Sequence, residues 1–217
     1  MKILGVSASP RKKESQTLLL LNEALLATQK LGASTELVDL PDLKIEFCLA
    51  CGHCHKKKGC VINDDVFVLL DKFLASDGFI LASPVYIRQV TASLKAVMDR
   101  STHFIHCQKL LGKYAGCVVT SGSGRGQEVL DYIRDYVVTC GAQYVGGISS
   151  EVPLTESVKE EARIFAQRLV EAIKMRKEYP EQLKEMGNFR KFFKDVIQAR
   201  KNEWEAEFRY WQKQGWI

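Results

Sequence analysis

Apolar runs alternate with amphipathic stretches along the first 177 residues of the chain. Continuous or alternating apolar segments predict five short strands, at Lys2–Val6, Ser34–Leu40, Gly78–Ala82, Tyr114–Thr120 and Gln143–Ile148. Between the strands, apolar positions recur every three to four residues, which is the period of an amphipathic helix. The expected helices cover approximately residues 17–31, 64–75, 91–101, 127–140 and 155–177.

Five strands separated by helices predict one doubly wound α/β domain with a parallel sheet, because neighbouring parallel strands need a crossover helix. A chain of 217 residues with 46% hydrophobic residues is long enough to bury such a core. Folds of this class bind ligands at the carboxyl ends of their strands. Polar segments rich in glycine and serine follow the first, third and fourth strands, so we expect a ligand there.

The chain changes character after Glu178, where Tyr179-Pro180 is expected to break the preceding helix. Residues 178–217 then predict a helical extension with one strongly apolar face, since six large side chains recur on spacings of three, four and seven. This face indicates packing either on the chain's own core or on a second subunit. The six side chains are Phe189, Phe193, Ile197, Trp204, Phe208 and Trp211.

Charge and hydropathy exclude two classes of partner. The net charge is +5, and acidic and basic residues are interleaved, so we expect no nucleic-acid partner. No apolar run approaches the roughly 20 residues that cross a bilayer, and the first residues do not resemble a signal peptide. We therefore expect a cytoplasmic protein without membrane contact, whose cysteines stay reduced.

Four of the seven cysteines lie in one short segment, CLACGHCHKKKGC, at Cys48, Cys51, Cys54 and Cys60. In a reducing compartment this concentration indicates a metal or redox site rather than disulfides. Four thiolates suffice to bind a [4Fe–4S] cluster, and two successive two-residue gaps let one loop reach three corners. Zinc is the alternative, although zinc sites usually place two cysteine pairs further apart.

Other polar residues of this segment have simpler interpretations. His53 and His55 are expected to be exposed loop residues, because four thiolates already complete a ligand set. Lys56–Lys58 is interpreted as a solvated face, or as a patch that attracts an acidic electron donor such as ferredoxin. A second metal site is left open further along the chain, at His103, His106 and Cys107.

The segment SASPRKKESQT joins the first strand to the first helix. Free backbone amides and the helix dipole at such a position favour an anion, and the hydroxyl groups with Arg11 suit a phosphate. Neither the GxxxxGK[ST] P-loop nor the GxGxxG turn is present, so nucleotide hydrolysis and dinucleotide binding are not expected. An ordinary helix-capping loop is the alternative.

Two later segments follow the third and fourth strands. SPVYIRQVTASLKAVMDR, from Ser83 to Arg100, places an aromatic side chain and backbone amides at the sheet edge, which suits a flat conjugated ring. TSGSGRG, from Thr120 to Gly126, contains glycines that allow a ligand to approach the backbone closely. The three segments together therefore predict one ligand site.

In residues 1 to about 175 these segments resemble the flavodoxin-like superfamily of NAD(P)H-dependent FMN reductases. The cysteine segment resembles the C-x2-C-x2-C-x4-7-C motif of the iron–sulfur flavoproteins within that superfamily. The resemblance implies a five-stranded parallel sheet of order 2-1-3-4-5, with a cysteine-rich loop after the second strand. It also implies FMN, a [4Fe–4S] cluster, an aromatic-rich C-terminal extension, and a homodimer or homotetramer.

Carried over to this chain, the resemblance assigns the cofactors to specific residues. The cluster falls on the four cysteines at 48, 51, 54 and 60, and Gln16 stands where the family often has Asn, which keeps a side-chain amide. The FMN phosphate falls on Ser9, Arg11, Ser15, Gln16 and Thr17. The flavin ring and ribityl chain fall on Ser83, Pro84, Val85, Tyr86, Ile87, Thr120, Ser121, Gly122, Ser123, Gly124 and Gly126.

The expected function is that of an electron-transfer oxidoreductase. FMN accepts one or two electrons and a cluster passes one at a time, so the pair would link a one-electron donor such as ferredoxin to a two-electron acceptor. No side chain is expected to act as acid or base, because the cofactors carry the chemistry. The cysteine loop is expected to lie over the same sheet edge as the flavin.

Two alternatives remain open. One is a cluster-free reductase that uses NAD(P)H to reduce FMN or a quinone. The other is a non-catalytic interaction protein with a zinc-stapled loop and a helical tail, against which the three ligand-edge segments argue.

Overall fold

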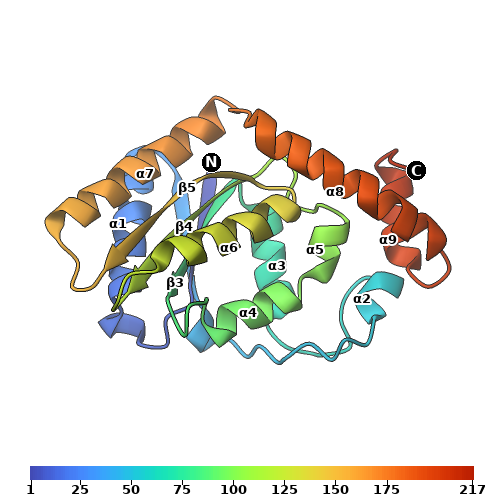
Figure 1. Cartoon of the computed structure of the whole chain (residues 1–217), viewed down its shortest axis with the longest axis horizontal. Coiled ribbons are helices and arrows are strands. Elements are labelled where there is room, and N and C mark those ends of the chain that lie inside the picture. Colours follow the sequence, from blue (N-terminus) through green and yellow to red (C-terminus); the bar gives the residue numbers. More distant parts are fainter.

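The computed structural model describes residues 1–217 as a three-layer α/β/α fold in which helices cover both faces of one sheet (Figure 1). All neighbouring strands are parallel, and their order is β2-β1-β3-β4-β5. The expected fold class is therefore confirmed. The strands are β1 (Lys2–Ser7), β2 (Ser34–Asp39), β3 (Gly78–Pro84), β4 (Tyr114–Ser121) and β5 (Gln143–Glu151).

The helices include three features that the sequence pattern did not predict. The cysteine loop contains a short helix, a separate helix α5 follows the helix expected over 91–101, and the extension contains two helices instead of one. Helix α4 ends at Asp99, close to Ser101, whose hydroxyl donates to the Met98 carbonyl at 2.8 Å. The helices are α1 (Gln16–Lys30), α2 (His53–Lys56), α3 (Val66–Ala75), α4 (Ala92–Asp99), α5 (Thr102–His106), α6 (Gly126–Thr139), α7 (Glu156–Lys174), α8 (Pro180–Ala199) and α9 (Glu205–Lys213).

The core consists of one apolar layer on each face of the sheet. Alternation along β1 sends Leu4 and Val6 to one layer and Ile3 to the other, as expected for a strand buried on both faces. The first layer packs beneath α3, α4 and α6, and the second beneath α1 and α7. None of the helices has both the length and the apolar composition that a membrane span requires.

The C-terminal extension packs on the chain's own core. Helix α8 runs along α6 and the β5 edge, and α9 lies beside α2 of the cysteine loop (Figure 1). Trp211 is only 1% exposed, packs with Ile197 and Cys107, and donates its indole N–H to the His106 carbonyl at 3.0 Å. Phe192 remains 64% exposed, so contact of the extension with a second subunit stays a prediction.

Replacing Trp211 with Ala should lower the free energy of unfolding by about 3–5 kcal/mol, because it removes a fully buried indole and leaves a cavity. Denaturant unfolding followed by circular dichroism measures the change. Phe192→Ala is the matched control on the same extension and should change stability by less than about 0.5 kcal/mol. Equal losses from both variants would show that the exposed face carries as much packing energy as the buried one.

Candidate functional site

The carboxyl ends of β1, β3 and β4 surround a cavity of about 200 Å³, which we call the edge cavity. It lies where the sheet topology places ligand sites in doubly wound folds. All three loops singled out from the sequence contribute to its wall, and one lining residue, Val152, comes from the segment after β5. The lining residues are Ser9, Arg11, Ser15, Gln16, Thr17, Pro84, Val85, Tyr86, Thr120, Ser121, Gly122 and Val152.

Hydroxyl groups dominate the buried part of the edge cavity. Ser15 caps α1, because its Oγ accepts the Leu18 amide N–H at 3.0 Å. The hydroxyls of Thr17 and Thr120 are 2.6 Å apart, which joins the first loop to the end of β4. The Ser121 hydroxyl is buried without a hydrogen-bond partner. A polar ligand would satisfy that orphaned group, and the start of α1 supplies free amides for an anion.

A tight turn borders the opening of the edge cavity. Tyr86 and Gln89 exchange both backbone hydrogen bonds, at 2.8 and 3.0 Å, and the two residues between them have left-handed backbone conformations. One of these is Ile87, with φ of +48°, a costly conformation for a β-branched residue. Its side chain is 97% exposed and does not line the cavity, whereas Tyr86 does.

Several residues assigned to the flavin lie outside the cavity wall, and two of them have structural contacts instead. The buried Ser83 hydroxyl donates to the Pro84 carbonyl at 2.9 Å and accepts the Thr91 amide at 3.1 Å. A Cβ atom on Gly126 would lie 1.7 Å from the Ser149 Oγ, so this glycine lets α6 pack on β5. The assigned residues outside the wall are Ser83, Ile87, Ser123, Gly124 and Gly126.

The sequence pattern does not predict Val152 as a lining residue, because the expected fifth strand ends at Ile148. Strand β5 continues to Glu151, so the segment that follows it reaches the same sheet edge. The rule that ligands bind at the carboxyl ends of parallel strands would have identified Val152.

The four clustered cysteines line a second cavity of about 340 Å³, which we call the cysteine cavity. All four thiols are free. The amide of Ala50 donates to the Cys48 sulfur at 3.4 Å, and that of Ile62 donates to the Cys60 sulfur at 3.5 Å. Four cysteine thiols are the ligand set of a [4Fe–4S] cluster, and hydrogen bonds to two of the sulfur atoms are of the kind that tunes such a cluster.

The spacing of the thiols argues against a single metal ion. A tetrahedral zinc site with bonds of 2.3 Å would bring its sulfur atoms to about 3.8 Å from one another. No three of these sulfur atoms lie within 4.8 Å of one another. Burial and the nearby Glu207 carboxylate raise the pKa of the Cys54 thiol to about 11, so binding of a metal centre there must displace a proton.

The cysteine cavity does not lie over the flavin edge, which corrects the sequence-based expectation. The two cavities share no lining residue, and α4 separates the loop after β3 from the cysteine loop (Figure 1). The reason is local: the Lys44 amide donates to Asp65 and the Glu46 amide donates to Asp64, both at 2.8 Å. These contacts join the two ends of the loop beside α3, and the short helix α2 of the loop lies beside α9.

His55 is not an exposed loop residue. Its Nδ1 atom lies 2.7 Å from one carboxylate oxygen of Glu207, and the Nδ1 atom of His106 lies 3.0 Å from the other. Both imidazoles stack on Trp204, with centroids 4.4 and 4.8 Å away. Burial alone would raise the pKa of Glu207, but the hydrogen bonds from the two imidazoles outweigh it and lower the pKa.

The His55–Glu207–His106 group is the one set of three ligand atoms within 4.8 Å of one another. Its N···O distances of 2.7 and 3.0 Å are hydrogen-bond distances, shorter than the roughly 3.3 Å between two ligands of a tetrahedral zinc ion. We therefore describe it as a latch between the extension and the cysteine loop. The sequence could not reveal it, because 152 residues separate Glu207 from His55.

The second metal site left open in the sequence is not assembled. His103 is not part of the latch: its ring stacks on Phe67 at 5.6 Å, and its Nδ1 atom is buried without a partner. Cys107 is buried against Ile197 and Trp211. Only His106 of the three residues contributes to a polar group.

The sequence matches a family model and several proteins named iron–sulfur flavoproteins. Residues 1–155 match the NADPH-dependent FMN reductases. An iron–sulfur flavoprotein of Archaeoglobus fulgidus is 31% identical over the full length of both chains. Another, of Methanosarcina thermophila, is 33% identical over 80% of this chain and 92% of its own. A third, of Methanocaldococcus jannaschii, is 41% identical over 58% of this chain and 65% of its own.

The chain belongs to the iron–sulfur flavoproteins. It is thus an FMN-dependent oxidoreductase, which excludes the non-catalytic interaction protein considered above. Solved structures share the fold of this flavoprotein. RosB with a bound flavin intermediate superposes with a TM-score of 0.67 at 16% identity, covering 87% of this chain and 85% of its own. The apo NADH:FMN oxidoreductase EMOB has a TM-score of 0.63 at 22% identity, covering 83% and 92%.

The pH dependence of stability should contain a component from His103. Burial and, to a lesser extent, the charge of Lys109 lower its pKa from 6.5 to about 4. Between these pH values the unfolded chain binds more protons than the folded one, so stability falls as the pH drops through this window. His103→Phe, which keeps a ring against Phe67, should flatten this dependence in denaturant unfolding between pH about 7 and about 4. An unchanged slope would mean that His103 titrates normally in the folded protein.

Proposed function

We propose that this flavoprotein is an electron-transfer oxidoreductase in which a [4Fe–4S] cluster exchanges electrons with FMN. The cluster would be bound by Cys48, Cys51, Cys54 and Cys60, and FMN by the edge cavity. One observation carries the proposal: four free thiols line the cysteine cavity, and the edge cavity of the same chain is lined by loops of the part that matches the FMN reductases. The name "iron–sulfur flavoprotein" of its relatives supports the same cofactor pair.

The residues of the edge cavity suit the parts of FMN. The Arg11 guanidinium, the hydroxyls of Ser9 and Thr17, and the start of α1 would bind the phosphate. The Ser121 hydroxyl, which lacks a partner, would donate to the ribityl chain or the ring. The ring itself would lie against Val85 and Tyr86 at the open side. When bound, FMN and the cluster supply the redox chemistry, and the chain positions them.

The proposed electron donor is a small acidic one-electron carrier of the ferredoxin type. Lys56, Lys57 and Lys58 are all exposed and begin two residues after Cys54. A local positive charge of this kind attracts an acidic partner to the surface beside the cysteine cavity. The two-electron acceptor would then react at the flavin.

A cluster-free reductase driven by NAD(P)H is the second candidate, because the matching family is described as NADPH-dependent. Turnover separates the two candidates. Rapid steady-state oxidation of NAD(P)H by an iron-free preparation would establish the second, whereas reduction by a one-electron donor that needs the iron would establish the first.

The assignment of FMN predicts that Arg11→Leu weakens flavin binding roughly ten- to a hundredfold, because a charge-assisted hydrogen bond to phosphate is lost. Titration of the flavin-free chain with FMN, followed by quenching of flavin fluorescence, measures the dissociation constant. Lys13→Leu is the matched control: Lys13 is an exposed cation in the same loop that does not line the cavity. Equal weakening of flavin binding in both variants would show that Arg11 acts only through general charge attraction.

The assignment of the cluster predicts that Cys51→Ala abolishes stoichiometric iron and acid-labile sulfide but leaves the flavin in place. This variant and a control variant are purified without oxygen and analysed for iron, sulfide, flavin and visible absorption. Cys140→Ala is the control, since Cys140 is fully buried and does not line the cysteine cavity. A wild-type protein that is yellow from flavin but contains no iron or sulfide under these conditions would refute the cluster.

A further inference from the structure

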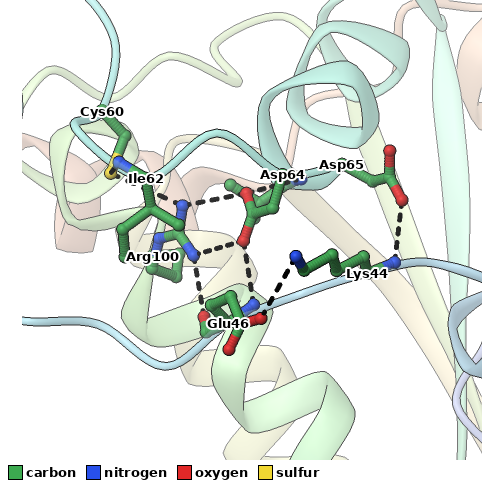
Figure 2. A network of polar contacts seen from close by, with 8 residues as sticks. Lys44, Glu46, Cys60, Ile62, Asp64, Asp65 and Arg100 are labelled. Carbon is green, nitrogen blue, oxygen red and sulfur yellow. Dashed lines mark hydrogen bonds and ion pairs between the residues drawn. The ribbon is translucent and has the colours of Figure 1, made fainter.

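Arg100 is the only arginine or lysine in the wall of the cysteine cavity. It follows α4 directly, and its side chain is 1% exposed, while that of its ion-pair partner Asp64 is 0% exposed. Figure 2 shows the guanidinium between the residues that it contacts, at the junction of the two ends of the cysteine loop. A fully buried charge in this position requires an explanation beyond surface solvation.

All the hydrogen-bond partners of the Arg100 guanidinium are acceptors. One terminal nitrogen of the guanidinium, Nη1, donates to the Asp64 carboxylate at 2.7 Å and to the Glu46 backbone carbonyl at 2.7 Å. The other donates to the second Asp64 oxygen at 3.0 Å and to the Cys60 sulfur at 3.5 Å (Figure 2). Arginine alone has the forked geometry that meets a carboxylate with two bonds and still has N–H groups for other acceptors.

The buried ion pair of Arg100 and Asp64 is not needed for packing alone. A buried ion pair costs desolvation energy, and an apolar pair of similar volume would often fill the same space without loss of stability. An apolar pair could not donate to a thiolate sulfur, whereas the guanidinium donates to the Cys60 sulfur and also brings a positive charge to it. Hydrogen bonds to sulfur and nearby charge are two of the factors that set the reduction potential of an iron–sulfur cluster.

We propose that Arg100 is a positioning residue of the cysteine site that raises the reduction potential of the cluster through its N–H···S contact with Cys60. This inference rests on the proposed function, because it concerns a cluster bound by these thiols. Reduction adds one negative charge to the cluster, so a buried cation at a ligand sulfur stabilises the reduced form more than the oxidised form. Asp64 keeps the guanidinium oriented, and its negative charge offsets part of that effect.

The proposal predicts opposite changes from the two partners. Arg100→Gln removes the positive charge and leaves Asp64 uncompensated, so the midpoint potential of the cluster should fall. Asp64→Asn leaves the positive charge uncompensated, so the potential should rise. Arg100→Lys keeps the charge without the fork and should give a value between those of the wild type and Arg100→Gln. A role in packing alone predicts no such ordering.

The experiment is an anaerobic redox titration of the full-length, cofactor-loaded protein, with the reduced cluster followed by electron paramagnetic resonance and the flavin by absorbance. A midpoint potential does not depend on how many molecules retain the cluster, so partial loss from a less stable variant leaves the comparison valid. Arg168→Gln is the matched control, because Arg168 is an exposed arginine on α7, across the sheet from the cysteine cavity. It should leave the cluster potential unchanged.

Coinciding cluster potentials in the wild type, Arg100→Gln and Arg100→Lys would overturn the role of Arg100, and so would shifts of the same sign in Arg100→Gln and Asp64→Asn. Either result leaves the proposed function intact, because the wild type would still contain a titratable cluster. A wild type without a cluster signal would instead refute the proposed function itself.

Discussion

The buried polar contacts at the two ends of α4 determine how the two candidate redox sites are related. At the start of the helix, Thr91 donates its hydroxyl to the Ala8 carbonyl at 2.9 Å and its amide to Ser83 at 3.1 Å, next to the edge cavity. At the other end, Arg100 is paired with Asp64 beside the cysteine cavity. The helix has eight residues, or about 12 Å of length, so it keeps the edge cavity and the cysteine cavity a short distance apart.

The C-terminal extension makes the cysteine site part of the folded core instead of a free loop. The latch between Glu207, His55 and His106 connects α9 to the cysteine loop. Trp211 on α9 also donates its indole N–H to the His106 carbonyl at the end of α5. The thiol-bearing segment is thus restrained by Arg100 on one side and by the extension on the other. Restraint of this kind lets a protein control the environment of a cluster through hydrogen bonds and burial.

The sheet and the edge cavity were predictable because their signals are local. Apolar periodicity marks each strand, and one topological rule places the loops after β1, β3 and β4 together. The surroundings of the cysteines were not predictable, since they depend on partners far away in the chain, such as Glu207 for His55. For the same reason the sequence predicted that the four thiols share one loop. It did not predict that this loop lies at the opposite end of α4 from the edge cavity.

Electron exchange between the proposed cluster and the flavin can be followed by rapid anaerobic mixing of the protein with a one-electron reductant. Absorbance of the cluster and of the flavin is followed separately in the cofactor-loaded wild type and in Cys51→Ala. We expect the cluster to be reduced first and the flavin to follow at a rate independent of protein concentration, with much slower flavin reduction in the variant. Equal flavin reduction rates in the two proteins would contradict this exchange.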